Sequence, residues 1–178
     1  MIIAMTVLYC AGVLVALGAL LAACVTDFRT MTIPNILPLL IAGSFVVAYA
    51  ASFGVAGDTP FAPPLVHLAA FAVMLLVTFL MFAFNLWGAG DSKLAAAIAL
   101  WIGIKGIVPF LLVMSLAGLG LIALNLVFTR TKFPVPGCGP QSWPEKARRG
   151  ERVLPYGIAI VAGAVAAFAA LGYLQIPG

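Results

Sequence analysis

The sequence predicts an all-α fold, that of a polytopic membrane protein with six transmembrane helices and both termini outside the cytoplasm. Composition is the first observation behind this prediction: the 178 residues are 65% hydrophobic and only 8% charged, with a mean hydropathy of +1.22. The second is that apolar runs of about 20 residues, the length that crosses the hydrocarbon core of a bilayer, recur along the whole chain. We expect residues 1–178 to form a single membrane-embedded domain.

Scanning for runs of that length predicts six spans, at residues 5–26, 36–53, 65–86, 92–104, 107–128 and 155–174. No Lys or Arg precedes Arg29, so the first run lacks the basic start of a cleavable signal peptide and is expected to stay as a helix. A Pro-Asn turn precedes the second span, and Pro155, a residue favoured at helix starts, opens the sixth.

The fourth span is short, roughly 20 Å long against a hydrocarbon core of about 30 Å. Either its helix runs past Lys105, or Asp91 at its start lies slightly below the headgroups. The sequence leaves both alternatives open.

Charge placement predicts the orientation. Of the nine Lys and Arg residues, all but Lys105 fall on one face of the predicted topology, and basic residues favour the cytoplasmic side. Six of them lie in a loop at 129–154 that is interrupted by Pro and Gly. We expect a cytoplasmic loop attracted to anionic lipid headgroups, with a role in substrate entry as the alternative. The net charge of +4 then requires no nucleic-acid partner.

Cysteine and histidine content argues against metal chemistry. Cys10, Cys24 and Cys138 lie on different segments with no C-x-x-C spacing, which indicates neither a zinc site nor a disulfide framework. His67 is the single histidine and is expected to be structural, near the outer end of the third span. We therefore expect no metal and no cofactor.

Asp27 and Asp91 stand out because both fall at span boundaries on the predicted cytoplasmic face. A charged residue carried to mid-bilayer costs on the order of 2.5 to 3.5 kcal/mol, so such residues usually serve chemistry. Two carboxylates that meet can act as an aspartic protease pair, one activating water and the other protonating the substrate carbonyl. Alternatively, Asp27 ends a helix at the interface and Asp91 is an N-cap.

Gly88 and Gly90 come just before Asp91, and they could let a substrate strand approach the acids. A protease must hold its substrate extended, because a helical peptide hides its scissile carbonyl. Residues without a Cβ allow enzyme backbone to approach such a strand closely.

Three segments resemble the type IV prepilin peptidases, membrane aspartic proteases of the GxGD class. They are Asp27 with Arg29 and Ile33-Pro34-Asn35, the run from Gly88 to Lys93, and Pro155-Tyr156-Gly157. The resemblance implies a bacterial inner-membrane, multi-pass enzyme whose catalytic pair is Asp27 and Asp91. Its partners would be prepilins or pseudopilins with a short basic leader and an apolar N-terminal helix. The substrate-positioning residues would be Arg29, Pro34, Asn35, Gly88, Gly90, Lys93, Pro155, Tyr156 and Gly157.

The chain departs from the longer members of that family, which carry a cytoplasmic insertion with paired C-x-x-C motifs associated with zinc and N-methylation. It therefore resembles the short, peptidase-only branch that serves Flp-type pili, and no methyltransferase activity is expected. The segments 33–35 and 155–157 retain a purely structural alternative, as a turn and a helix start.

Two other function classes remain. A presenilin-like intramembrane protease would also use paired Asp residues. Such enzymes have a Tyr directly before one of these Asp residues, whereas Asp27 follows Thr26. A small transporter or assembly subunit would use the acids to bind a cation or a proton.

Overall fold

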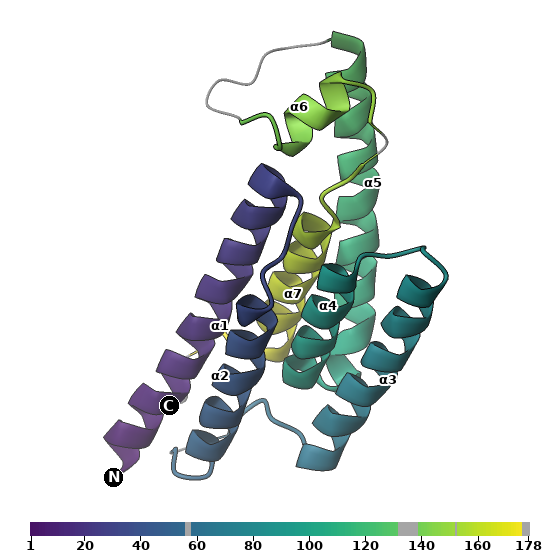
Figure 1. Ribbon diagram of the computed structural model, residues 1–178. Coiled ribbons are helices and arrows are strands. Elements are labelled where there is room, and N and C mark those ends of the chain that lie inside the picture. The colour runs from purple at the N-terminus through teal and green to yellow at the C-terminus, as the bar shows by residue number, and fades with distance from the viewer. Residues whose placement is uncertain (56–57, 132–138, 152, 176–178) are drawn as a thin grey trace.

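A computed structural model describes the chain except for residues 56–57, 132–138, 152 and 176–178 (Figure 1). The described residues are helical and contain no strand, which confirms the all-α class. Cys138 and part of the basic loop lie outside the described residues. The elements are α1 (Ile2–Thr30), α2 (Ile36–Ser52), α3 (Pro64–Ala83), α4 (Ala89–Ile102), a 3₁₀ turn η1 (Ile104–Gly106), α5 (Ile107–Thr131), α6 (Trp143–Arg148) and α7 (Tyr156–Leu171).

Each predicted span overlaps one of these helices, although the ends differ. Three helical stretches are long and apolar enough to cross a membrane, at Ile2–Thr30, Pro64–Ala83 and Ile104–Arg130, whereas α2 and α7 are apolar but shorter. The six-span topology and the location of the termini remain predictions.

The fourth predicted span is a buried central helix. α4 ends at Ile102, where Gly103 adopts a φ of 56°, so the alternative in which this helix runs past Lys105 is wrong. Every residue from Leu94 to Ile102 is buried, and α2, α3 and α7 all pack on α4 (Figure 1). A helix that is apolar on all sides is expected in such a position.

Small residues let the outer helices approach one another closely. On α1, a Cβ at Gly12 would lie 2.8 Å from the Cβ of Ala48 on α2. On α7, a Cβ at Gly163 would lie 2.6 Å from the Phe110 carbonyl oxygen on α5. Contacts of this kind are typical of helix pairs in membranes, where van der Waals packing replaces the hydrophobic effect.

Hydrogen bonds to backbone carbonyls connect the end of α4 farthest from Asp91 to its neighbours. Trp101 Nε1 donates to the Ile41 carbonyl at 2.8 Å, and the Tyr173 hydroxyl donates to the Trp101 carbonyl at 2.7 Å. His67 is buried there, with Nδ1 2.8 Å from the Leu100 carbonyl oxygen. Because a carbonyl only accepts, Nδ1 carries the proton, and these contacts give His67 a structural role.

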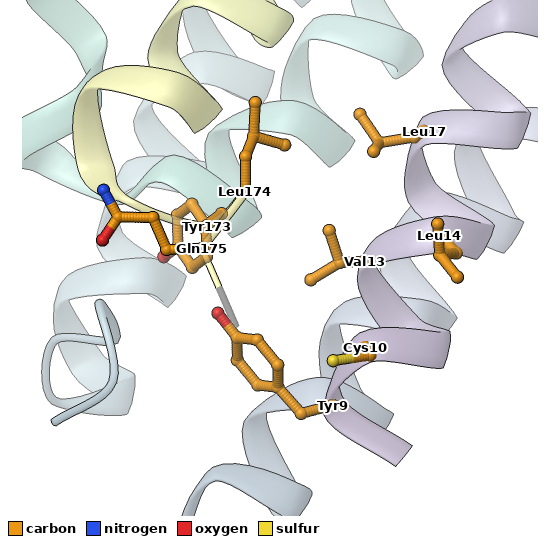
Figure 2. A pocket seen from close by; sticks show the side chains of 8 residues that line it. All are labelled: Tyr9, Cys10, Val13, Leu14, Leu17, Tyr173, Leu174 and Gln175. Carbon is orange, nitrogen blue, oxygen red and sulfur yellow. The ribbon is translucent and has the colours of Figure 1, made fainter. Parts of the chain in front are cut away.

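A cavity of about 240 Å³ also lies near this end, between α1 and the segment after α7 (Figure 2). Tyr9 and Cys10 line it from α1, and Tyr173, Leu174 and Gln175 line it from the other side. Leu17, the lining residue on α1 nearest to Asp27, is ten residues before it, roughly 15 Å along the helix. The cavity is therefore separate from the acids.

The helix α6 lies within the predicted basic loop, whose Pro and Gly residues were expected to prevent a long helix, and it is only six residues long. Its first residue, Trp143, is buried between Phe28 of α1 and Phe128 of α5, with ring centroids 6.2 Å and 5.3 Å away. Trp143 Nε1 also donates to Asn125 Oδ1 at 3.0 Å. This part of the loop is thus packed against the end of α1 that carries Asp27.

Candidate active site

Asp27 and Asp91 line one open cavity of about 300 Å³. Its walls come from the last turn of α1, the connection between α1 and α2, and the start of α4. The other lining residues are Met31, Thr32, Ile33, Gly88, Ala89 and Gly90. The two carboxylates are close enough to interact electrostatically. Residues 64 positions apart in the sequence therefore face the same small volume.

Asp27 is held by the start of α7. Its side chain is only 5% exposed, and its Oδ2 accepts a hydrogen bond of 2.8 Å from the backbone N–H of Gly157. Gly157 is the second residue of α7, and the first N–H groups of a helix have no partner within the helix. The carboxylate satisfies one of them at the positive end of the helix dipole.

This contact depends on the absence of a side chain at residue 157. A Cβ there would lie 2.8 Å from Asp27 Oδ2 and 3.0 Å from Ile33 Cδ1. Any larger residue would push the carboxylate away from the backbone N–H that orients it.

Asp91 is the third residue of α4, and Gly88 is the N-cap, so Asp91 is not itself the N-cap residue. The backbone N–H of Gly88 faces the partly buried carboxylate. The indole N–H of Trp87 lies near it as well, but makes no hydrogen bond of good geometry with any described atom. The next residue, Ser92, anchors this turn to α3 by donating to the Thr78 carbonyl at 3.0 Å.

Ile33 joins the three segments that the sequence analysis singled out. A Cβ at Gly90 would lie 3.1 Å from the Ile33 Cβ, and one at Gly157 would lie 3.0 Å from its Cδ1. The connection between α1 and α2 therefore packs between the starts of α4 and α7. Met31 directs it there by ending α1 in a left-handed conformation, with φ 55°.

Residues 14–123 match the type IV leader peptidase family, and this stretch contains both acids and the whole cavity lining. The chain belongs to the type IV leader peptidase family. Membership implies a peptidase that processes prepilins, and the three long apolar helices are in keeping with a membrane protein. No curated protein and no solved structure matches the chain.

The other residues predicted to position substrate in this leader peptidase lie around the acid cavity rather than in it. Lys93 donates to Asn35 Oδ1 at 2.9 Å, and both are exposed. Arg29 and Pro34 are exposed on either side of the turn that follows α1. Pro155 is the buried N-cap of α7.

Tyr156 faces a smaller cavity of about 180 Å³ that it shares with Trp87. The two rings meet edge to face, with centroids 6.1 Å apart. Tyr156 thus contacts the residue that precedes Gly88, and only indirectly the acids.

Sequence reasoning missed several residues at this site. Met31, Thr32 and Ile33 line the cavity, and Trp87 lies near Asp91, yet none was named as a site residue. An apolar residue directly before a Pro-Asn turn was the available signal for Ile33, because it must pack against something when the turn lies at a helix boundary. In the described part of the chain, no group of three or more His, Cys, Asp or Glu residues lies together.

Proposed function

We propose that this leader peptidase family member is an aspartic endopeptidase in which Asp27 and Asp91 form the catalytic pair. It removes the short basic leader from type IV prepilins of the Flp type at the cytoplasmic face of the inner membrane. The observation that carries the proposal is the shared cavity, which is lined by two acids from distant segments of the chain.

Two acids in one cavity can divide the work of peptide hydrolysis. In this mechanism the pair shares one proton, because two carboxylates that face the same site do not both ionise readily. The ionised carboxylate takes a proton from water as the water oxygen bonds to the scissile carbonyl carbon, and the protonated one gives its proton to the carbonyl oxygen. The C–N bond then breaks as the departing amine takes up a proton from the first carboxyl, while one hydroxyl of the gem-diol returns its proton to the second carboxylate. A carboxylic acid and an amine leave, and the pair again holds one proton.

The hydrogen bond from Gly157 orients this pair. It occupies one oxygen of Asp27 and leaves the second available to the cavity. Holding a reacting group in position is worth several orders of magnitude in rate, so we assign Gly157 a positioning role, with the start of α7 as its rigid support.

The peptide strand would lie along Gly88, Ala89 and Gly90, which border the cavity beside Asp91. Gly88 and Ala89 are exposed, so an extended backbone can approach there. The limited length of α4 supports a site slightly below the headgroups, reached by water from the cytoplasmic side.

We assign the chain to the peptidase-only branch because its sequence has no C-x-x-C pair with which to build a zinc-stapled methyl-donor site. The Flp-type specificity rests on the same feature.

Replacing each acid by Asn tests the catalytic pair, since Asn keeps the shape but cannot carry the proton. We expect Asp27→Asn and Asp91→Asn each to lower leader cleavage by roughly 10²- to 10⁴-fold or more, and the double variant to be no worse than the poorer single one. Cleavage is measured by gel shift and N-terminal sequencing of a co-expressed prepilin, and insertion by membrane fractionation.

Asp58→Asn is the matched control, because Asp58 is an exposed acid outside the cavity. It should cleave like the parent chain. Normal cleavage by either cavity variant would refute the aspartic mechanism and favour a transport or assembly role for the acids.

A further inference from the structure

An apolar groove runs between α2 and α3 beside the acid cavity. The two helices hardly touch each other, and both pack on α4, which forms the floor between them (Figure 1). The groove has a volume of about 360 Å³. Leu39 and Ala42 line it from α2, Phe71 and Leu75 line it from α3.

The floor of the groove is made of small side chains. Ala96 and Ala97 line it from α4, and Ala42 lies on the adjoining wall. Small residues allow a further helix to pack closely in a membrane, where association depends on van der Waals contact. A groove lined over about two turns can accept the i, i+3, i+4 and i+7 side chains of one helix face.

One end of the groove adjoins the acids. Asn35 and Lys93 mark this end, and Asn35 follows directly on the connection whose residues 31–33 line the acid cavity. Lys93 is two residues after Asp91, and Ala97 is four residues further, about 6 Å along α4. This end of the groove is therefore the one nearer to Asp91 along α4.

Lys93 also places a positive charge at this end of the groove. Its cation is exposed and hydrogen-bonded to a neutral amide, so it repels a basic leader. The leader is therefore directed away from the groove, towards the side of the two carboxylates, and the uncharged part of the substrate remains next to α4.

We propose that the groove between α2 and α3 binds the apolar helix that follows the scissile bond of the prepilin. The proposal rests on the proposed function and adds where the mature part of the substrate docks. A lipid acyl chain would also satisfy an apolar lining. Asn35 and Lys93, at the end of the groove, are each two residues from a residue that lines the acid cavity, Ile33 and Asp91. This proximity and the cation at that end favour the substrate helix.

Photo-crosslinking at adjacent leucines tests the proposal. Benzoylphenylalanine replaces Leu39 or Leu75, which line the groove, or their neighbours Leu40 and Leu76, which are exposed but do not line it. Each enzyme is reconstituted in vesicles with the full prepilin, irradiated and analysed by mass spectrometry. We expect the prepilin's apolar helix to cross-link to residues 39 and 75, and several-fold less to residues 40 and 76.

A groove-filling variant gives an independent readout. Ala42→Phe should raise the KM for the full prepilin roughly tenfold, and should leave unchanged the cleavage of a short soluble peptide that ends soon after the scissile bond. Ala72→Phe, at an exposed position on α3 away from the groove, is the control and should alter neither.

Equal cross-linking at all four positions, cross-linking of the groove to lipid alone, or an equal loss of both substrates in Ala42→Phe would overturn the proposed docking. If the parent chain cleaves the prepilin while the groove fails these tests, only the docking site is wrong. If the parent chain cleaves neither substrate, the proposed function is wrong and the docking site falls with it.

Discussion

At the scale of single residues, the site depends on carboxylates placed at helix ends. Asp27 lies in the last turn of α1, where the helix dipole disfavours a negative charge by about 0.3 to 1 kcal/mol. Its hydrogen bond to Gly157 places the same carboxylate at the favourable end of α7, which offsets that cost. The helix that carries Asp27 disfavours its charge, and a distant helix stabilises it. This arrangement is expected of a functional acid rather than of a simple helix cap.

Gly157→Ala should disturb Asp27 specifically. The added Cβ would collide with Oδ2 at 2.8 Å and displace the carboxylate from the N–H group that orients it. We expect kcat for leader cleavage to fall roughly tenfold to a hundredfold, with a smaller change in KM. Steady-state kinetics on a purified prepilin measure both.

The control for this variant is Gly18→Ala on α1, where a Cβ would meet no atom within 4 Å. It should keep full activity and gain up to about 1 kcal/mol of helix stability. Equal losses in the two variants would mean that Gly157 has no particular role at the site.

At the scale of elements, α6 is stabilised by packing rather than by helix propensity. The helix α6 is only six residues long, too short to persist alone in water. It forms because Trp143 packs between Phe28 and Phe128 and its indole N–H reaches Asn125. This links the basic loop to the turn of α1 that carries Asp27.

Trp143→Ala should release α6 from α1 and α5. Removing a buried aromatic ring costs about 3 to 5 kcal/mol, more than a six-residue helix can offset. We expect hydrogen exchange at residues 143–148 to become fast, together with a partial loss of leader cleavage.

Trp143→Phe separates packing from hydrogen bonding. It keeps an aromatic ring but loses the bond to Asn125, worth about 1 kcal/mol, so residues 143–148 should remain largely protected. Unchanged exchange in Trp143→Ala would contradict the anchoring role.

At the scale of the whole molecule, the mechanism requires both acids on the cytoplasmic side. Cys138 lies in the basic loop that the charge distribution assigns to that side. A membrane-impermeant thiol reagent should therefore miss Cys138 in intact cells and label it in inverted vesicles. A variant with Cys10 and Cys24 replaced by Ser isolates its signal.

Asp58→Cys in a background without other cysteines provides the opposite control, since the predicted topology puts residue 58 outside. It should be labelled in intact cells. Labelling of Cys138 from outside would place Asp27 and Asp91 on the wrong face for a prepilin leader.

The sequence as a whole also predicts that the enzyme cleaves the prepilin without methylating the new N-terminus. Its predicted cytoplasmic segments are about nine residues after the first span, a few residues around Asp91 and the Pro-rich loop at 129–154, and the sequence has no paired cysteines with which to staple a methyl-donor pocket. Purified enzyme in detergent should cut its prepilin without added metal, remain active in chelator, and leave an unmethylated N-terminus in the presence of S-adenosylmethionine. Mass spectrometry of the mature pilin decides the matter, because an added methyl group that depends on this protein would reveal a donor site.

Sequence by itself determined the helices and the candidate acids. Apolar run length predicted segments that each overlap a helix of the structure, three of them long enough to cross a membrane, because backbone groups in an apolar setting must bond within a helix. The scarcity of charge made Asp27 and Asp91 conspicuous in the same way, since a charge near a bilayer is rarely kept without a use.

Only the tertiary structure decided how these parts meet. Local pattern carries no information on which helix starts lie beside which ends, so it could not show that Gly157 holds Asp27 or that Ile33 packs between Gly90 and Gly157. It also could not predict α6, because that helix is stabilised by contacts with residues far along the chain. Long-range packing of small residues, rather than helix propensity, brings the three segments together around Asp27 and Ile33.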